Sequence, residues 1–566
     1  MRAIRAKKPA PVPCPRVGLL EVSVIAALAV ICAATMVLAE TPPTVAWIDR
    51  YDGSEGGNDQ VTAMDMDAAG NIYVTGYSSG TWWDIATVKY APDGSQLAAV
   101  RFNGVQGGDD VPYAVEVDAN GNVYVAGYSD GNGQYNYDLI LIKYNSSLVQ
   151  QWVRTYAGQG NVDNDEAYDI AIDASGNIYV TGFSFEATSD YVTIKYRPDG
   201  MREWVRRYDG PAHDGDGAQS VVVDDLGGVY VTGISGQTPG EFNNDCFTIK
   251  YDTNGVVQWG HRFEGTGHGG DSGIALDLDD SRNVYVAGYA TGTGTNFDLL
   301  TIKYDTNGTI QWSRTYDGPN HKFDSALAID VDGAGNVCVT GDVFTASAGT
   351  DYATVKYDTL GNQEWAATYD GPVHGYDEGQ KIVLDDEGNV YVTGYSDGGV
   401  GMVDYDYATV KYGPGGQEQW VVRYDGPGDN IDVAAGLSID DLGSVVVSGW
   451  STGTVGTTVD FATIRYDQNG AVDVPHDAAS GQVVLFASPN PFESSTTLHF
   501  ALSRETPVVL QVFDLSGRAV QTLLDRRLPA GNHSVDFDAK AFAPGVYFYS
   551  LQAEGKVRSG KLVRRQ

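Results

Sequence analysis

The twelve residues DASGNIYVTGFS at 173–184 decide the fold, because the chain repeats them almost word for word. DAAGNIYVTGYS stands at 67–78 and DDEGNVYVTGYS at 385–396. The phrase Asn-x-Tyr-Val-x-Gly, with small variations, starts at eight positions: 71, 122, 177, 228, 283, 336, 389 and 444. Successive starts are 51 to 55 residues apart, a period typical of propellers and solenoids.

Each copy contains four segments with strand character. In the third copy they are AYDIAID (167–173), NIYVTGFS (177–184), DYVTIKY (190–196) and REWVRRYDG (202–210). Asp-x-x-Gly-Asn separates the first two, and Arg-Pro-Asp-Gly at 197–200 separates the last two, so both connections carry turn residues. Four short antiparallel strands joined by tight turns make one propeller blade.

The ends of the repeat region predict how the propeller closes. The repeat region begins with a segment that matches only the fourth strand of a unit, AWIDRYDG at 46–53. It ends with a segment that matches the third strand, DFATIRYDQNG at 460–470, and no fourth strand follows it. If the N-terminal strand completes the last blade, no exposed sheet edge remains. We therefore expect an all-β fold: a closed propeller of eight four-stranded blades over residues 40–470, with seven blades as the alternative.

Composition narrows the class of protein. The 566 residues contain 36 Lys and Arg against 74 Asp and Glu, a net charge of -38. This balance excludes nucleic acid and anionic lipid as expected partners, since both need basic surface. Residues 1–39 have the basic leader, the apolar run (22–39) and the small-residue end of a cleaved signal peptide. An uncleaved membrane anchor over 22–39 is the alternative, and we expect no membrane span after cleavage.

Two of the four cysteines, Cys14 and Cys32, leave with the predicted signal peptide. Cys246 and Cys338 remain, in different and non-neighbouring repeats. Two distant cysteines do not make a disulfide framework, so we expect two buried free thiols.

Three columns of residues recur through the copies. A Gly ends the second strand in all eight, and we expect it where backbones approach closely: Gly76, Gly127, Gly182, Gly233, Gly288, Gly341, Gly394 and Gly449. The third strand carries an Asp, at Asp84, Asp138, Asp190, Asp245, Asp298, Asp351, Asp406 and Asp460. Five residues later it carries a cation, at Lys89, Lys143, Lys195, Lys250, Lys303, Lys356, Lys411 and Arg465.

The odd offset places the Asp and the cation on opposite faces of the strand. We expect the two to pair between blades, or the Asp to accept backbone N–H groups, rather than to form a ring of binding sites. A Trp occupies the fourth strand of seven units and is expected in the core between blades, with Ala98 in the eighth place: Trp47, Trp152, Trp204, Trp259, Trp312, Trp365 and Trp420.

Candidate metal ligands are few and scattered. Four loops share His-x-x-Asp, namely His213 with Asp216, His268 with Asp271, His321 with Asp324, and His374 with Asp377. One imidazole per blade is too few for a transition-metal site, so we expect a hydrogen bond within each pair.

Calcium is the metal that the sequence suits best. Acidic loops such as NVDNDE (161–166) and HDGDG (213–217) offer oxygen ligands, although EVDANG at 116–121 fails the EF-hand rule because Gly127 stands at position twelve. No catalytic, cofactor-binding or metal-binding residue is assigned, and nucleophile elbow, phosphate loop, HExxH and CxxC patterns are absent from the sequence.

The repeat resembles the bacterial beta-propeller repeat family, also called seven-bladed beta-propeller repeat proteins. The resemblance rests on the Gly-Asn-Ile-Tyr-Val-Thr-Gly phrase, on Asp-x-x-Thr-Ile-Lys-Tyr and on Trp-x-x-x-Tyr-Asp-Gly, and it covers about four fifths of the chain. It implies a propeller fold and leaves the function open.

A second domain follows a predicted linker at 471–482. Residues 483–566 carry ten Lys and Arg against seven Asp and Glu, whereas 40–482 carry 21 against 66. Alternating segments at 496–502, 508–515, 534–538 and 545–552 predict a small immunoglobulin-like β-sandwich. SPNPF (488–492), VFDLSGRAV (512–520) and PGVYFYSL (544–551) resemble the type A sorting domain of the type IX secretion system and the related domain of flagellar hook-capping proteins.

These expectations combine into one hypothesis about function. The resemblance of the second domain implies export to the outside or the outer surface of a Gram-negative-type bacterium, with the type IX machinery as partner. The uniform blades favour a monomeric binding scaffold for protein, glycan or cation, and no enzyme. The alternative is a secreted polysaccharide hydrolase or lyase that acts in the propeller channel.

Overall fold

The computed structural model describes residue 40, residues 42–468 and residues 485–564, apart from short segments within them. In the propeller these segments are 54–55, 105–106, 131–135, 159–163, 238–243, 295, 346–348, 400–403, 429, 441 and 454–457. After residue 485 they are 489–494, 503, 505, 514–517, 530, 541, 544 and 554–555. The predicted signal peptide and linker lie outside the described residues. Within them, no helix is long and apolar enough to cross a membrane.

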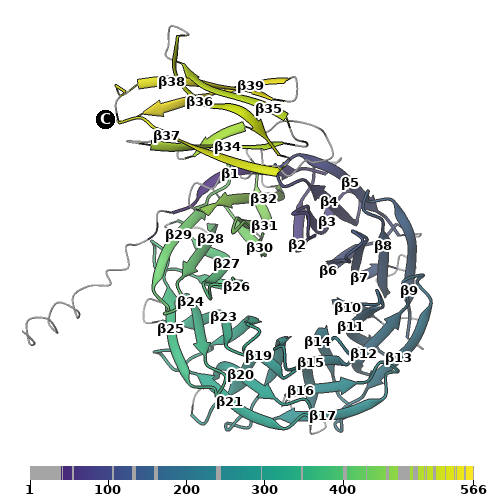
Figure 1. The fold of residues 1–566 in the computed structure, drawn as a ribbon. Helices are drawn as coiled ribbons and strands as arrows, with labels where there is room; N and C mark the ends of the chain where they lie inside the picture. The colour runs from purple at the N-terminus through teal and green to yellow at the C-terminus, as the bar shows by residue number, and fades with distance from the viewer. Residues whose placement is uncertain are drawn as a thin grey trace, which may run out of the picture. The chain divides into compact units, whose positions relative to one another are not determined.

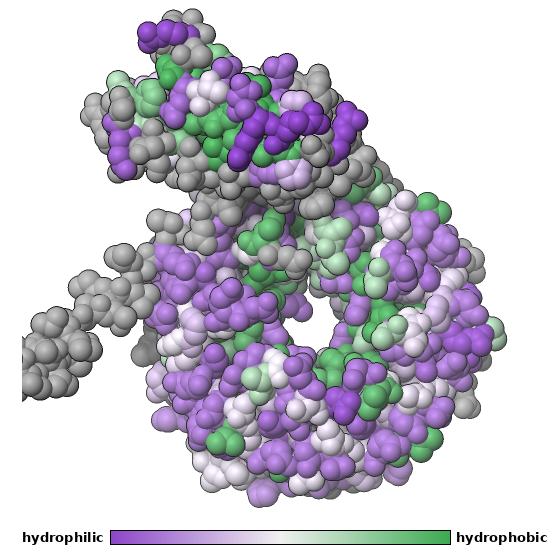
Figure 2. All heavy atoms as spheres, in the orientation of Figure 1, coloured by the Kyte–Doolittle hydropathy of each residue, from purple (hydrophilic) through white to green (hydrophobic). Residues whose placement is uncertain are grey.

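Eight four-stranded antiparallel sheets form the propeller and follow one another around a central opening (Figures 1 and 2). Blades 1 to 4 consist of β2 (Asp59–Met66), β3 (Ile72–Ser79), β4 (Trp83–Tyr90), β5 (Gln96–Phe102); β6 (Asp110–Val117), β7 (Val123–Asp130), β8 (Tyr137–Tyr144), β9 (Gln150–Tyr156); β10 (Asp165–Ile172), β11 (Ile178–Phe185), β12 (Ser189–Tyr196), β13 (Arg202–Tyr208); and β14 (Gly217–Val223), β15 (Val229–Gly236), β16 (Asn244–Tyr251), β17 (Val257–Phe263). Blades 5 to 8 consist of β18 (Ser272–Leu278), β19 (Val284–Thr291), β20 (Phe297–Tyr304), β21 (Ile310–Tyr316); β22 (Ser325–Val331), β23 (Val337–Phe344), β24 (Thr350–Tyr357), β25 (Gln363–Tyr369); β26 (Asp377–Leu384), β27 (Val390–Asp397), β28 (Tyr405–Tyr412), β29 (Glu418–Tyr424); and β30 (Asp432–Ile439), β31 (Val445–Thr452), β32 (Val459–Asp467), β1 (Thr44–Tyr51). The prediction of eight blades is confirmed, and the seven-bladed alternative is wrong.

Strand β1 supplies the fourth strand of the last blade, as the split repeat predicts. It pairs antiparallel with β32, so that Tyr51 lies opposite Phe461 and Ile48 opposite Ile464. Strand β2 of blade 1 contacts β30 of blade 8. The last blade therefore contains strands from both ends of the repeat region.

The repeated phrase folds as the turn and second strand of each blade. In blade 3, the Asp173 carboxylate accepts the backbone N–H groups of Ser175 and Asn177, and Gly176 takes a φ of 77°. Glycine adopts that left-handed conformation at no steric cost, which explains why the phrase carries Gly in most copies; blade 5 has Arg282 there, with a φ of 62°. Strand β11 then continues as a nearly continuous buried run.

The invariant glycine lies within the second strand, three residues before its end, and packs against a β-bulge in the first strand. In blade 3, a Cβ on Gly182 would stand 1.9 Å from the carbonyl oxygen of Glu166, just before the register shift between Ala167 and Asp169. In blade 8, Gly449 faces Val433 in the same way and also the Tyr407 hydroxyl of the preceding blade. The prediction of close backbone approach is confirmed.

Trp side chains and lysines join each blade to the next. The indole N–H of Trp204 donates to the carbonyl of Thr253 in the following blade at 3.1 Å, and Lys195 Nζ donates to the same carbonyl at 3.1 Å. Lys195 also lies over the ring of Tyr179 in its own blade. The prediction that the tryptophans pack between blades is confirmed.

Carboxylates on the innermost strands cover the sheet edges that face the channel. Asp65, Asp277 and Asp330 accept the backbone N–H groups of Val117, Val331 and Leu384, each on the first strand of the next blade, at 2.6 to 2.9 Å. An inward-pointing charge of this kind protects an otherwise unpaired strand edge.

Both remaining cysteines are buried free thiols, as predicted. Burial raises the pKa of the Cys246 thiol to about 12. A thiol held in this neutral form is a poor nucleophile and serves as core packing.

The C-terminal part forms two antiparallel sheets that enclose their own hydrophobic core. One contains β33 (Leu485–Ser488), β34 (Ser495–Leu502) and β37 (Gly531–Asp538); the other contains β35 (Thr506–Phe513), β36 (Ala519–Leu528), β38 (Gly545–Ala553) and β39 (Lys556–Arg564). Phe500, Leu510, Phe537 and Leu551 are almost fully buried between them. The four predicted strands are present, and three more complete the sheets. The predicted domain boundaries at 470 and 483 stay predictions.

Candidate ligand-binding mouth

Every blade presents the same strand ends to the same side of the propeller. On one side, which we call the mouth face, first and third strands begin and second and fourth strands end. On the opposite side, the turn face, lie the tight turns between strands one and two and between strands three and four. The mouth face therefore carries the longer and more variable loops, where function is usually found in a rigid scaffold.

Exposed aromatic side chains of the propeller are confined to the mouth face within the described residues. Trp82 and Trp83 are adjacent and each 42% exposed, and Phe185, Phe323 and Tyr376 lie on other blades of this face. The large hydrophobic side chains exposed at the turn face are aliphatic instead, for example Leu226, Leu360 and Leu442. Burial alone cannot explain this segregation, since both faces contact water.

Four blades repeat an aromatic pair at this face. The residue after the invariant glycine packs against the first residue of the third strand, with ring centroids 4.4 to 4.9 Å apart. The pairs are Tyr77 with Trp83, Tyr128 with Tyr137, Tyr289 with Phe297, and Tyr395 with Tyr405. Tyr113 and Tyr168 extend the cluster across blades 2 and 3. The mouth face thus presents flat, rigid rings with hydroxyl groups at their edges.

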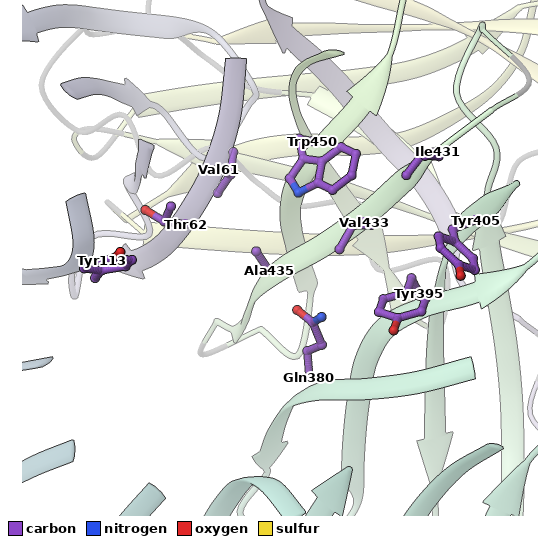
Figure 3. A pocket seen from close by; sticks show the side chains of 10 residues that line it. All are labelled: Val61, Thr62, Tyr113, Gln380, Tyr395, Tyr405, Ile431, Val433, Ala435 and Trp450. Carbon is purple, nitrogen blue, oxygen red and sulfur yellow. The ribbon is translucent and has the colours of Figure 1, made fainter. Parts of the chain in front are cut away.

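An open pocket of about 560 Å³ lies in the mouth where the two ends of the repeat region meet (Figure 3). Its wall is largely apolar and aromatic, and ten residues from blades 1, 2, 7 and 8 line it: Val61, Thr62, Tyr113, Gln380, Tyr395, Tyr405, Ile431, Val433, Ala435 and Trp450. Ala435 is the smallest residue at the bulge of any first strand, where blade 2 has Tyr113 and blade 7 has Gln380. The size and the mostly apolar wall suit a small-molecule or sugar ligand.

Glutamates hold the tyrosines of the pocket from two sides. Glu378 accepts the Tyr395 hydroxyl at 3.0 Å and the Gln380 amide N–H at 3.2 Å. Across the mouth, Tyr113 donates to Glu166 at 3.4 Å. Burial, strengthened by Glu378, raises the pKa of Tyr395, so its hydroxyl stays protonated and donates.

The sequence analysis missed these aromatic residues. The columns of Gly, Asp and Lys are nearly constant, whereas the rings stand one place after the invariant glycine, in a column that also contains Ile234 and Asp342. A search for aromatic enrichment beside the glycine could have found them. The pocket itself forms because particular blades adjoin, and a comparison of the repeats cannot show which residues of neighbouring blades come together.

A further column of aspartates anchors the mouth loops, and four of its eight members are the aspartates of the His-x-x-Asp pairs. A buried aspartate opens the first strand or directly precedes it in all eight blades: Asp59, Asp110, Asp165, Asp216, Asp271, Asp324, Asp377 and Asp432. Each accepts the N–H of the glycine that ends the Tyr-Asp-Gly phrase or stands in its place, at 2.5 to 2.9 Å. Burial raises the pKa of Asp432 to about 6. These aspartates close the loops and give the mouth its rigidity.

The prediction of a hydrogen bond within each His-x-x-Asp pair is wrong. The imidazole of His213 bonds to Asp209, four residues earlier, at 2.7 Å, and His268, His321 and His374 bond in the same way to Glu264, Asp317 and Asp370. The aspartate that follows each histidine is the loop anchor just described. The four histidines have φ of 51° to 57°, so the local turn aims their rings backward along the chain.

Five of the eight third-strand aspartates pair in a way that was not predicted. In five blades each forms an ion pair with an arginine on the fourth strand of the same blade, at 2.7 to 3.1 Å: Asp84 with Arg101, Asp190 with Arg207, Asp245 with Arg262, Asp406 with Arg423, and Asp460 with Arg50. The equivalent fourth-strand residue in the other three blades is threonine: Thr155, Thr315 and Thr368. Four cations of the same strand, Lys89, Lys143, Lys195 and Lys303, do reach the next blade, but they bind its carbonyl groups. Arg465 instead pairs with Asp440 and Asp467 of its own blade.

Among the described residues, five groups of three aspartates gather at mouth loops, with ligand oxygens within 4.8 Å of one another. Three groups include an aspartate that an arginine neutralises, whereas the groups Asp298, Asp317, Asp324 and Asp351, Asp370, Asp377 have threonine at the arginine position. Three carboxylates fall short of the six to eight oxygens that calcium takes. In the loop at 116–121, Asp118 accepts the N–H groups of Asn120 and Asn122 and so shapes a turn. Residues 161–163 of the other acidic loop lie outside the described part, and calcium binding stays a prediction.

Comparisons with known proteins agree with both parts of the fold. Residues 103–134, 151–184 and 368–400 match the beta-propeller repeat family, and 443–474 match a beta-propeller domain of unknown function. Residues 487–565 match the secretion system C-terminal sorting domain. Both resemblances are thereby confirmed: segments of the chain match beta-propeller repeats, and its C-terminal part matches a sorting domain of the type IX secretion system. The sorting domain indicates secretion or an outer-surface location in bacteria and implies interaction with the type IX machinery.

The chain is also similar to single proteins, though distantly. It is 24% identical over 399 residues to an uncharacterized WD repeat-containing protein, L264, of Acanthamoeba polyphaga mimivirus; the match covers 64% of this chain and 25% of the relative, so the chain spans about a quarter of it. Among solved structures, Sqt1 from Chaetomium thermophilum is 11% identical with a TM-score of 0.43, covering 74% of this chain and 98% of that one. The periplasmic gluconolactonase PpgL of Pseudomonas aeruginosa is 14% identical with a TM-score of 0.38, covering 64% and 98%.

Proposed function

We propose that this secreted propeller protein is a binding module that holds glycans at its mouth face. The observation that carries the proposal is the confinement of exposed aromatic side chains to that face, together with the aromatic pocket. Sugar rings present flat C–H faces that pack on aromatic rings, and their hydroxyls need hydrogen-bonding groups nearby. Tyr395, Tyr405 and Gln380 supply both kinds of contact in one pocket.

Rigidity supports binding at this face. The aromatic pairs fix the ring planes, and the eight aspartate anchors fix the loops that carry them. A site whose side chains are already ordered loses little conformational entropy when a ligand binds.

The competing hypothesis is a polysaccharide hydrolase or lyase that acts in the channel. Glycoside hydrolysis ordinarily needs two carboxyl groups that flank the bond to be cleaved. Asp65, Asp277 and Asp330 face the channel, but each accepts a backbone N–H of the next blade. Because these three carboxylates already accept hydrogen bonds from the strand edges, their arrangement favours a binding function over catalysis.

The test is an oligosaccharide array, followed by calorimetric titration of the full chain with the best ligand. We expect saturable binding without product release, and a loss of about tenfold or more in affinity for the Trp82→Ala/Trp83→Ala double variant or for Trp450→Ala. Leu226→Ala and Leu360→Ala remove exposed apolar side chains of the turn face and serve as matched controls. Binding that survives all mouth variants would refute the proposal, and chain shortening of the oligosaccharide would favour the hydrolase.

A further inference from the structure

One column of the repeat places aromatic side chains on five consecutive blades. The residue directly after the invariant glycine is aromatic in blades 7, 8, 1, 2 and 3, but it is Ile234 in blade 4 and Asp342 in blade 6. We call these five side chains the aromatic arc: Tyr395, Trp450, Tyr77, Tyr128 and Phe183. Blade 5 also has a ring in this column, Tyr289, but the residues of blades 4 and 6 separate it from the arc.

The arc continues across the junction of the last blade with the first. Strand β2 of blade 1 contacts both β30 and β31 of blade 8, and β31 carries Trp450. The mouth pocket lies at this junction and contains two members of the arc, Tyr395 and Trp450, in its wall (Figure 3). The pocket therefore occupies one end of the arc, and the other end lies on blade 3.

Ring contacts connect the pocket to that other end. Between ring centroids, Tyr113 lies 5.9 Å from Tyr128 and 5.2 Å from Tyr168 of blade 3. Tyr168 in turn lies 5.7 Å from Phe183. Because Tyr113 also lines the pocket with Trp450, a continuous aromatic surface leads from the pocket across blades 2 and 3.

The rings of the arc are partly exposed and held in place. Four of the five are half-buried, and Tyr128 is 8% exposed. The Tyr77 hydroxyl donates to the side-chain carbonyl of Gln60, and the Tyr395 hydroxyl donates to Glu378 at 3.0 Å. Aromatic rings fixed in this way can pack against successive sugar rings with little loss of conformational entropy.

The charge of this surface favours an uncharged ligand. None of the ten residues that line the pocket carries a charge, and the five members of the arc are uncharged as well. The net charge of -38 repels an acidic chain before it reaches the mouth. The wall of the pocket thus offers aromatic and hydrogen-bonding contacts and no partner for an ionic group.

The length of the arc favours a chain over a small sugar. Sheets that pack face to face lie about 10 Å apart, so an arc over five blades extends over roughly 40 Å. A monosaccharide or disaccharide can fill the pocket but cannot also reach Phe183.

We infer that the mouth binds a neutral polysaccharide as an extended chain, with one sugar in the pocket and the following sugars along the aromatic arc to blade 3. This inference rests on the proposed glycan-binding function and deepens it by naming the ligand class. Each further ring of the arc adds contact area, so affinity should rise with the length of the chain.

The experiment measures affinity against chain length. The full chain is titrated calorimetrically with neutral oligosaccharides of glucose, mannose and xylose, each as a disaccharide and as a hexasaccharide. We expect at least one hexasaccharide to bind about tenfold or more tightly than the disaccharide of the same sugar.

Three variants locate this gain. Phe183→Ile gives blade 3 the residue that blade 4 carries at Ile234, so the scaffold accommodates it. It should weaken binding of the hexasaccharide about fivefold and leave the disaccharide unaffected, whereas Trp450→Ile in the pocket should weaken both. Tyr289→Ile is the matched control, because it makes the same kind of change in the same column outside the arc. Thermal unfolding of each variant checks that the propeller remains folded.

The outcomes separate this inference from the proposed function. Equal affinity for the two lengths in all three sugars, or equal effects of Phe183→Ile and Tyr289→Ile, overturns the extended chain and leaves glycan binding standing. Binding of acidic sugars alone on the oligosaccharide array also overturns it. A blank array overturns the proposed function together with this inference.

Discussion

At the scale of the residue, the mouth is organised by side chains that each satisfy a particular backbone group. Asp216 shows the principle: its carboxylate accepts the N–H of Gly210 at 2.6 Å and that of Gly236 at 3.1 Å, which ties the loop before the first strand to the end of the second. Such charge-assisted bonds are stronger than neutral ones and order the loops that carry the aromatic rings.

The arginine that pairs with a third-strand aspartate gives a residue-scale prediction. Arg423 binds the Asp406 carboxylate, the Tyr369 and Ser396 hydroxyls and two carbonyl groups. Arg423→Ala should destabilise the propeller by about 1–3 kcal/mol, since the pair is only partly exposed. Thr368→Ala, at the equivalent position of blade 6, should cost about 0.5 kcal/mol or less. Differential scanning calorimetry checks both, and equal shifts in Tm would contradict the role of the arginine.

The residue scale is also where prediction from sequence failed most clearly. The partners of His213 and Asp190 could not be foreseen from the sequence. The partner of His213 depends on the positive φ of that residue, and the partner of Asp190 depends on the register between β12 and β13. Asp190 and Arg207 are 17 residues apart, and only the pairing of β12 with β13 brings them together. Turn residues such as Gly176 were predictable, since their conformational requirement is local.

At the scale of the element, each first strand depends on the blade before it. In blades 2, 6 and 7, a carboxylate from the first strand of the preceding blade accepts a backbone N–H from the inner edge of this strand. Bringing several carboxyls together in a narrow channel has an electrostatic cost. Burial, with Asp65 and Asp169 nearby, raises the pKa of Glu116 to about 8, and burial with Asp330 nearby raises that of Asp277 to about 7.

These shifts predict how stability depends on pH. A carboxyl whose pKa is raised on folding stabilises the folded state most at low pH, and this stabilisation is lost as pH rises through the folded pKa. We therefore expect Tm to fall between pH 5 and pH 8.5. Glu116→Gln should reduce this fall, raising Tm at pH 8.5 and changing it little at pH 5. Asp199→Asn, at an exposed turn, is the control. A Tm that is constant or rises over this range contradicts the assignment.

Strand β1 gives the second prediction at the scale of the element. Deleting residues 42–51 removes the pairing with β32, the Arg50–Asp460 ion pair and the bond from Trp47 to the carbonyl of Pro92. We expect aggregation on size-exclusion chromatography, because β32 then exposes a long unpaired edge. A synthetic peptide of residues 42–53 added during refolding should restore the monomer. Val45→Thr, at an exposed position of β1, is the control, and a soluble, monomeric deletion variant would refute the role of β1.

At the scale of the whole molecule, the period of the sequence determined the architecture well. Eight copies of a phrase with its own turn signals specify eight blades, and the unmatched segments at 46–53 and 460–470 specify the shared last blade. The pocket could not be predicted in the same way. It combines Thr62, Tyr113, Gln380 and Trp450, which lie far apart in the sequence and meet where the first and last blades adjoin.

The sorting domain gives the prediction for the molecule in its cell. Deleting residues 487–565 should leave the propeller folded and retain it in the periplasm, since the remaining chain lacks the part that matches a secretion signal. Immunodetection in periplasmic and surface fractions measures this. Fusing residues 483–566 to an unrelated exported protein should direct that protein to the cell surface. Normal surface delivery of the deletion variant would refute the sorting function of this domain.

The central claim is that the aromatic mouth is the binding surface, and a crystal structure of the full chain with a bound oligosaccharide tests it most directly. The account predicts density for a sugar ring in the pocket, packed against Trp450 and Tyr395, with hydrogen bonds to Gln380 or Glu378. An intact sugar bound at the turn face or on the C-terminal sandwich, with the mouth pocket empty, would contradict it.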